Sequence, residues 1–175
     1  MVVKPRDIRR EKKQDCFQAE KDSHKPCYHM DSNIWLGALI PDDERMRIKH
    51  ENFLKDIIND RHKTVGASVV IMGEIIKKLK ENLDKDKDAF FTALDFFGKL
   101  IFKGKLKVHS ICPEDNKIVD EIVSETRIRA DLPELIELTV MIKERSGVFV
   151  TMEKIADNQI LREYMNNSGI SIKRF

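Results

Sequence analysis

Four acidic residues stand where short apolar runs give way to helical patterns. Asp31 follows the run CYHM, Glu74 lies early in one helical pattern, and Asp131 opens another. Glu153 lies two residues after Thr151, just beyond the run VFV. Carboxylates that share a site repel one another, so a site of this kind usually needs divalent cations. Its all-oxygen ligands suit Mg²⁺ or Mn²⁺, with water completing the coordination shell.

Alternating strand and helix patterns would position these acids. The runs expected to form strands are 27–30, 63–67, 105–111, 148–150 and 170–175. The segments expected to form helices are 34–40, 42–60, 69–83, 86–105, 114–127, 131–147 and 152–169. Strands that alternate with helices indicate crossover connections and a parallel sheet covered on both faces. We therefore expect an α/β fold with a central, mainly parallel sheet of about five strands flanked by helices.

In open α/β sheets, ligands bind beyond the carboxyl ends of the strands, which is where Asp31 falls. Each acid also has an ordinary explanation when taken alone. Asp31 and Asp131 could cap helices, Glu153 could favour a helix N-terminus, and Glu74 could be a solvated helix acid. The neighbours of Glu74 are largely apolar, however, which raises the cost of a charge there. The placement of all four at one sheet edge indicates a shared site.

Several other residues carry structural signals. Ser68 is the expected N-cap of the helix that bears Glu74. Gly147 is expected to stop the helix that follows Asp131. Trp35 and the pairs Phe90/Phe91 and Phe96/Phe97 occur at helical spacing, so we expect them in the core or at a dimer surface.

The order of these motifs resembles the PIN domain, a family of metal-dependent ribonucleases that includes the VapC-type toxins. MDSNIWLGAL resembles the opening strand, acid and helix of the family, and GASVVIMGEIIKKL resembles its second motif. RADLPELIELTVMIKERSGVFVTMEKI is similar to the closing half of the family pattern. The resemblance covers residues 26–175 and implies a PIN-like three-layer nuclease domain. Residues 1–25 would then be a charged N-terminal extension.

Carried over position by position, the resemblance implies a set of site residues. The three core metal-binding acids would be Asp31, Glu74 and Asp131. Glu153 would be the fourth acid, where the family more often has Asp. Thr151 would supply the hydroxyl that supports the first acid, and Asn33 would be the polar residue after it.

The resemblance also implies an activity and partners. It implies hydrolysis of RNA phosphodiester bonds by metal-activated water, with Mg²⁺ or Mn²⁺ as cofactor and no protein nucleophile. The chain could be the toxin of a toxin–antitoxin pair, with an antitoxin protein as partner, and a homodimer is expected at the family level. The alternative is a catalytically inactive PIN-like module that binds RNA or protein. Metal titration would distinguish the two.

Composition limits the other possibilities. With 175 residues, 41% hydrophobic and 35% charged, the chain is expected to be soluble, globular and cytoplasmic, because no apolar run approaches a membrane span. A net charge of +2 neither indicates nor excludes a nucleic-acid partner. Basic residues near the acids could contact RNA locally, or they could form an ordinary solvated face. These residues are Lys77, Lys78, Lys80, Arg127 and Arg129.

Three rival sites have weaker support. Zinc ligation by Cys16, His24, Cys27 and His29 matches no closed zinc motif, and the last two residues fall in an expected core strand. A haloacid-dehalogenase-like phosphatase would need Asp-x-Asp, whereas this chain has Asn33 at the second position. Dinucleotide binding would need a Gly-rich turn after the first strand, and none occurs there.

Overall fold

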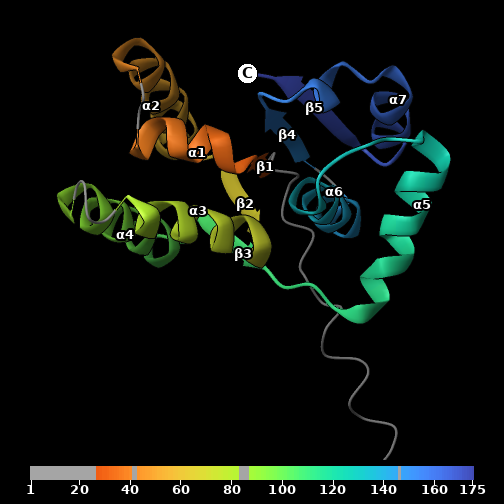
Figure 1. Cartoon of the computed structure of the whole chain (residues 1–175), viewed down its shortest axis with the longest axis horizontal. Helices are drawn as coiled ribbons and strands as arrows, with labels where there is room; N and C mark the ends of the chain where they lie inside the picture. Colours follow the sequence, from red (N-terminus) through yellow and green to blue (C-terminus); the bar gives the residue numbers. More distant parts are fainter. Residues whose placement is uncertain (1–26, 41–42, 83–86, 146) are drawn as a thin grey trace, which may run out of the picture.

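The central sheet is parallel throughout, with the strand order β3-β2-β1-β4-β5 (Figure 1). The computed structural model describes residues 27–40, 43–82, 87–145 and 147–175, and the expected extension over residues 1–25 lies outside them. The five strands in the described residues confirm the expected α/β fold and sheet. They are β1 (Cys27–Met30), β2 (Thr64–Ser68), β3 (Leu106–His109), β4 (Gly147–Thr151) and β5 (Ile170–Arg174).

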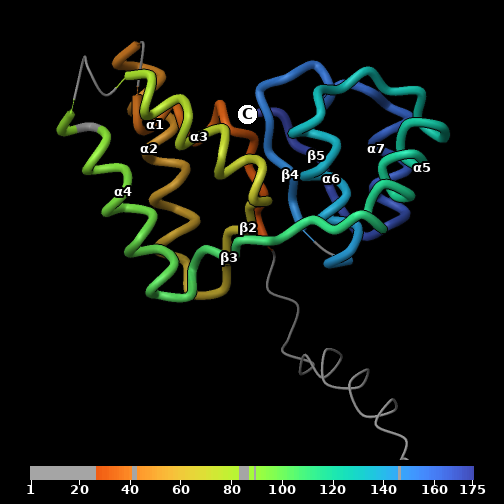
Figure 2. Tube along the Cα trace, turned by 60° about the horizontal axis from the view of Figure 1, so that its bottom comes forward, coloured from red at the N-terminus to blue at the C-terminus, as the bar shows by residue number. Residues whose placement is uncertain are grey.

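Helices cover the sheet in two groups, which gives the expected three layers. Figures 1 and 2 show α1 to α4 on one side of the strands and α5 to α7 on the other. Within the described residues, no helix is both long and apolar enough to cross a membrane. The helices are α1 (Ser32–Leu39), α2 (Glu44–Asn59), α3 (Val69–Glu81), α4 (Lys87–Phe102), α5 (Asn116–Thr126), α6 (Leu132–Glu144) and α7 (Gln159–Asn167).

The chain order reverses at the centre of the sheet. From β1 the chain builds outward through β2 to β3, and it then returns to place β4 on the other side of β1. The N–H of Asp31 donates to the carbonyl of Val150 at 3.0 Å, so the ends of β1 and β4 emerge side by side. A reversal of this kind is the switch point at which open α/β sheets bind ligands.

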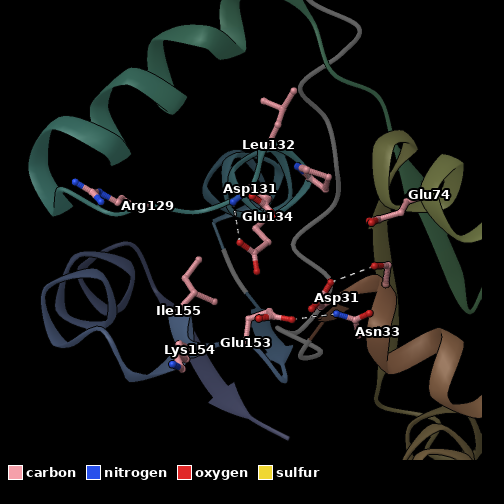
Figure 3. Close-up of a pocket in the computed structure, with 12 residues that line it drawn as sticks. Asp31, Asn33, Glu74, Arg129, Asp131, Leu132, Glu134, Glu153, Lys154 and Ile155 are labelled. Atoms are coloured by element: carbon pink, nitrogen blue, oxygen red, sulfur yellow. Dashed lines mark hydrogen bonds between the residues drawn. The ribbon is translucent and has the colours of Figure 1, made fainter. Parts of the chain in front are cut away.

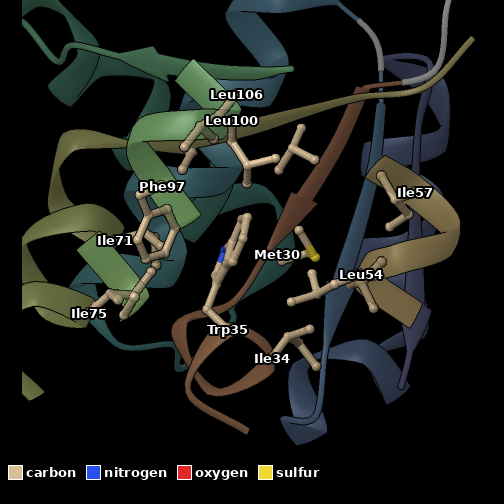
Figure 4. Packing of buried hydrophobic residues seen from close by; sticks show 14 of the residues in the cluster. Met30, Ile34, Trp35, Leu54, Ile57, Ile71, Ile75, Phe97, Leu100 and Leu106 are labelled. Atoms are coloured by element: carbon tan, nitrogen blue, oxygen red, sulfur yellow. The ribbon is translucent and has the colours of Figure 1, made fainter. Parts of the chain in front are cut away.

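Two apolar cores hold the layers together, one for each group of helices. On the side of α1 to α4, Met30 and Val150 pack with Trp35 and Phe97 (Figure 4). Trp35 is fully buried, and its ring centroid lies 5.1 Å from that of Phe97. These two aromatic residues are therefore core residues, as expected, whereas Phe91 is 62% exposed.

The opposite face of β1 carries a buried polar residue. Met30 pairs with Val150 towards one core, and His29 pairs with Phe149, which belongs to the core on the side of α5 to α7. On the β2 side, His29 is opposite Gly66. A Cβ at Gly66 would lie 2.3 Å from His29 Nε2, so the imidazole can lie there only because the position is glycine.

Two expected helix boundaries are wrong. Helix α6 ends at Glu144, and Arg145 takes the left-handed conformation, with φ 55°, that closes its last turn. Gly147 instead begins β4, with φ 138°, where a Cβ would lie 2.6 Å from the carbonyl oxygen of Cys27. The helix expected over 152–169 is split into a 3-10 turn at Lys154–Asp157 and α7. The split occurs because the side chain of Asn158 caps α7.

Two glycine substitutions test the close contact at Gly66. Gly66→Ala is expected to lower the free energy of unfolding by about 1–3 kcal/mol, because the methyl group displaces the buried His29 ring. A Cβ added at Gly73 in α3 would have no atom within 4 Å. Gly73→Ala should therefore raise the free energy of unfolding by about 0.5–1 kcal/mol. Urea unfolding measures both, and an unchanged stability in Gly66→Ala would contradict the contact.

Candidate active site

An open pocket of about 550 Å³ lies beyond the carboxyl ends of β1 and β4 (Figure 3). Acidic side chains line it from the end of β1, from α3, from the start of α6 and from the segment after β4. The structure thus brings the four acids nominated from the sequence around one cavity, together with a fifth acid. The five are Asp31, Glu74, Asp131, Glu134 and Glu153.

Asp31 is the buried member of this set, with 4% of its surface exposed. Thr151 Oγ1 donates to Asp31 Oδ2 at 3.1 Å, and Ser32 Oγ donates to Asp31 Oδ1 at 3.3 Å. Burial raises the pKa of Asp31, the charges of Glu153 and Glu74 raise it further, and the two hydroxyl groups oppose the shift. A cation beside Asp31 would offset this unfavourable environment.

Glu153 is tied to the same junction. Its backbone N–H donates to Thr151 Oγ1 at 3.0 Å, and its Oε1 accepts a hydrogen bond from Asn33 Nδ2 at 3.1 Å. The Thr151 hydroxyl therefore contacts both the acid before α1 and the segment that carries Glu153. Asn33, on the exposed side of α1, fixes the direction of the longer Glu153 side chain.

Glu74 reaches the pocket from α3, where it is half-buried. Ser68 Oγ accepts the N–H of Ile71 at 3.2 Å, so α3 begins immediately after β2 and the predicted N-cap is confirmed. Glu74 lies six residues after this cap, and Figure 3 shows its carboxylate directed towards the side of the pocket where Asp31 lies.

Glu134 is the acid that the sequence interpretation missed. It lies in the first turn of α6, half-buried, and its Oε2 accepts the N–H of Asp131 at 3.1 Å. Burial raises the pKa of Glu134 to about 7, the bond from Asp131 opposes the shift, and the charges of Asp31, Glu153 and Asp131 add to it. In the sequence, Glu134 is the last residue of an Asp-x-x-Glu pattern. The same pattern describes a capping box, so Glu134 has a local structural explanation and was not nominated as a site residue.

The donor set fits a hard divalent cation. All five side chains offer carboxylate oxygens, and burial together with the repulsion among them raises the pKa values of Asp31 and Glu134. In the described part of the chain, no three His, Cys, Asp or Glu residues lie close enough together to hold an ion as they stand. Mg²⁺ keeps several waters and binds through one or two carboxylates, and an open pocket suits such partial coordination.

A second cavity of about 460 Å³ adjoins the pocket and shares Asn33 and Glu153 with it. Of the five basic candidates from the sequence, Arg129 lines the acidic pocket and Lys78 lines the second cavity. Lys77, Lys80 and Arg127 line neither of these two cavities. One of these candidates therefore lines each cavity, and Lys154, which was not among them, also lines the acidic pocket.

The residues considered for zinc are arranged differently. His29 is fully buried in β1, where its Nδ1 lies 2.6 Å from Glu137 Oε1 and its Nε2 lies 3.5 Å from Cys27 Sγ. Cys16 and His24 lie outside the described residues. His29 is thus a core histidine that is paired with a carboxylate.

Comparison with known proteins identifies the fold. Known protein families and curated proteins give no match to the sequence. A chain of the VapBC2 complex from Rickettsia felis, solved with promoter DNA, superposes with a TM-score of 0.57 at 16% identity, covering 85% of this chain and 98% of that chain. VapC20 of Mycobacterium tuberculosis, a toxin that cleaves the sarcin-ricin loop, gives 0.51 at 15% identity, covering 70% and 86%.

A DNA-bound VapBC structure from Salmonella typhimurium gives a TM-score of 0.50 at 16% identity, covering 85% of this chain and 98% of that chain. The molecule therefore has an α/β fold that is PIN-like. More particularly, it has the fold found in VapC and VapBC toxin structures, as the motif order suggested. At this level of identity the shared property is the fold.

Replacement of Glu134 tests the electrostatics of the pocket. Because its pKa is about 7 in the folded protein, against an ordinary value of 4.5, the folded state holds a proton that the unfolded chain releases. The free energy of unfolding should therefore fall as pH rises from about 4.5 to about 7. In metal-free buffer at pH 8, Glu134→Gln should be more stable than the natural protein by about 1–3 kcal/mol.

Urea unfolding at several pH values measures this difference. Glu163→Gln, an exposed change on α7, serves as the control and should follow the natural protein. Identical pH dependence in the natural protein and Glu134→Gln would contradict the unfavourable environment of Glu134.

Proposed function

We propose that this chain is a metal-dependent ribonuclease that hydrolyses RNA phosphodiester bonds. The supporting observation is the ring of five carboxylates around one pocket at the switch point of the sheet, with the pKa values of Asp31 and Glu134 raised. Perturbed acids that gather in a cleft are a physical signature of a functional site. The fold shared with VapC toxins agrees with this chemistry.

The chain's own residues have distinct roles in this proposal. Mg²⁺ or Mn²⁺ bound at the carboxylates would lower the pKa of its water and polarise the phosphate. Asp31 would be the central ligand, because Thr151 and Ser32 fix both of its oxygens. Glu74 and Glu134 would face it across the pocket, and Glu134 would lose its proton when a cation binds.

Asp131 and Glu153 are exposed at the mouth of the same pocket. We propose that they contact the cation through water, and that Asn33 directs Glu153 towards it. This revises the order of importance implied by the family resemblance, because the Glu134 carboxylate is more buried than that of Asp131 and burial raises the pKa of Glu134 to about 7. In this proposal Glu134 replaces Asp131 as the third core acid.

RNA would need basic groups to offset this acidic centre. Arg129 and Lys78 lie in adjoining cavities, so they are suited to contact phosphates on either side of the cleaved bond. The Arg129 guanidinium can bind a phosphate through two parallel hydrogen bonds. We therefore propose that the RNA strand follows the line from Arg129 across the carboxylates to Lys78.

An antitoxin protein is the proposed regulator. Two of the similar structures are VapBC complexes bound to DNA. An Arg or Lys side chain of an antitoxin would be complementary to the five carboxylates and would exclude the cation. In this proposal the chain is the toxin of a toxin–antitoxin pair that acts on cytoplasmic RNA, and it forms a homodimer.

Two observations favour a second candidate function. The described carboxylates do not form a group of three that is ready to hold an ion, and Glu153 stands where the family more often has Asp. A PIN-like module that binds RNA or a protein partner without cleaving it would tolerate both features. Mn²⁺ titration distinguishes the candidates, because a module of this kind has no need to bind metal at the pocket.

Asp31→Asn tests the nuclease proposal. We expect this variant to cleave mixed RNA at least about 100-fold more slowly in Mg²⁺ or Mn²⁺, because metal stabilisation of the transition state is worth several kcal/mol. Asn still accepts the Thr151 hydroxyl, so the fold should survive. Asp120→Asn, an exposed change on α5, is the matched control and should retain full activity. Equal rates for the natural protein and Asp31→Asn would remove Asp31 from the mechanism.

The basic residues are tested in the cleavage-inactive Asp31→Asn background. Arg129→Ala and Lys78→Ala should each weaken binding of single-stranded RNA several-fold and reduce the slope of log affinity against log salt by about 0.7–1. Fluorescence polarisation of a labelled RNA at several salt concentrations gives both quantities. Lys77→Ala, whose side chain is 74% exposed and outside both cavities, should change neither. A similar effect from all three variants would indicate nonspecific attraction rather than a binding track.

A further inference from the structure

Glu137 is a fully buried carboxylate that the proposed chemistry does not use. It lies on α6, three residues after Glu134, and lines neither of the two cavities at the site. Its Oε1 lies 2.6 Å from His29 Nδ1, and its Oε2 accepts the N–H of Ser68 at 2.8 Å. Both oxygens of one carboxylate therefore contact other elements of the fold.

These contacts join the elements that carry the acids. His29 lies on β1, two residues before Asp31. Ser68 ends β2 and caps α3, the helix that bears Glu74. Glu137 thus connects one helix, α6, to β1 and to the N-terminus of α3.

The connection is geometrically constrained on every side. The absence of a Cβ at Gly66 leaves room for the His29 ring, and Cys27 Sγ contacts its other nitrogen. His109 of β3 packs beside His29, with ring centroids 5.6 Å apart. The Ser68 hydroxyl is engaged at the start of α3. A carboxylate in this position also interacts favourably with the positive end of the α3 dipole.

Stability alone does not explain this arrangement. His29 and Glu137 are both fully buried, and their side chains contact each other at 2.6 Å across two elements of the fold. Desolvation of such a pair costs several kcal/mol, and well-packed apolar residues are often at least as stable. A buried pair of this kind is better explained by the specific arrangement that it imposes.

We propose that Glu137 is a positioning residue of the active site. By binding β1 and the start of α3 at once, it sets the spacing between Asp31, Glu74 and Glu134. This inference rests on the proposed function, because the spacing matters through metal binding. Glu137 itself would touch neither the cation nor the RNA.

Three single variants separate positioning from stability. Glu137→Ala removes both contacts and should weaken Mn²⁺ binding by about 10–100-fold, as loss of supporting partners does at metal sites. Glu137→Gln can still accept the Ser68 N–H and donate to a neutral His29, so it should recover most of that affinity. Met141→Ala, which removes a buried side chain of the same helix, should lower stability but leave Mn²⁺ affinity unchanged.

Calorimetric titration of each folded variant with Mn²⁺ is the primary measurement, and RNA cleavage is the second. If Glu137→Ala does not fold, the double variant His29→Leu, Glu137→Leu replaces the buried pair with apolar side chains. That protein should fold yet bind Mn²⁺ weakly, because nothing accepts the Ser68 N–H. Mn²⁺ affinity equal to that of the natural protein in either variant overturns the proposal.

Hydrogen exchange distinguishes failure of this inference from failure of the proposed function. In Glu137→Ala or the double variant, the amides of Ser68 and of the first turn of α3 should exchange at least about 10-fold faster, whereas Met141→Ala should leave them unchanged relative to the rest of α3. If the natural protein neither binds Mn²⁺ nor cleaves RNA, the proposed function fails. If the amides of α3 exchange at the natural rate in both Glu137→Ala and the double variant, the positioning role is overturned irrespective of activity.

Discussion

The hydrogen-bonded junction between the ends of β1 and β4 is the constraint on which the pocket depends. The backbone of Asp31 bonds to Val150, and its carboxylate bonds to the Thr151 hydroxyl, although the residues are about 120 positions apart in the chain. The same hydroxyl accepts the N–H of Glu153. This junction exists because β4 returns to lie beside β1. The remaining acids come from segments that cover the same edge.

The pocket is electrostatically unfavourable to the fold that holds it. Burial and neighbouring acids raise the pKa values of Asp31 and Glu134, so each carboxylate is less stable charged here than in water. The two apolar cores must offset that penalty. Such local loss of stability is common where a site is built for a ligand that supplies the opposite charge.

Much of the fold could be predicted because its signals are local. Apolar runs marked all five strands, and the Ser68 side chain marked the start of α3. Two helix boundaries could not be predicted, because Arg145 adopts a left-handed conformation that usually favours glycine, and the Asn158 cap interrupts an apparently continuous helical pattern. Both depend on local conformations that residue type alone does not determine.

The site was predictable in position but not in composition. Glu134 has a capping role that accounts for it locally, and only the three-dimensional placement reveals Asp31 and Glu153 nearby. Glu137 had a clearer signal, because a lone acid within LIELTVMI is unusual in a buried helix. His29, a polar residue in a core strand, was the matching signal. Because His29 and Glu137 are 108 residues apart, the sequence shows two unusual buried polar residues but does not show that they contact each other.

The two acids at the start of α6, Asp131 and Glu134, show how capping and the proposed metal binding can share one helix end. Asp131 is exposed, and its backbone N–H is bound by Glu134 Oε2. Figure 3 shows the Glu134 side chain extending from α6 into the space that Asp31 and Glu153 border. If Glu134 turns fully to a cation, the Asp131 N–H loses its acceptor and must be solvated, which is inexpensive at an exposed helix start. The exposed position of Asp131 therefore allows the neighbouring, more buried acid to change partners without disrupting the helix.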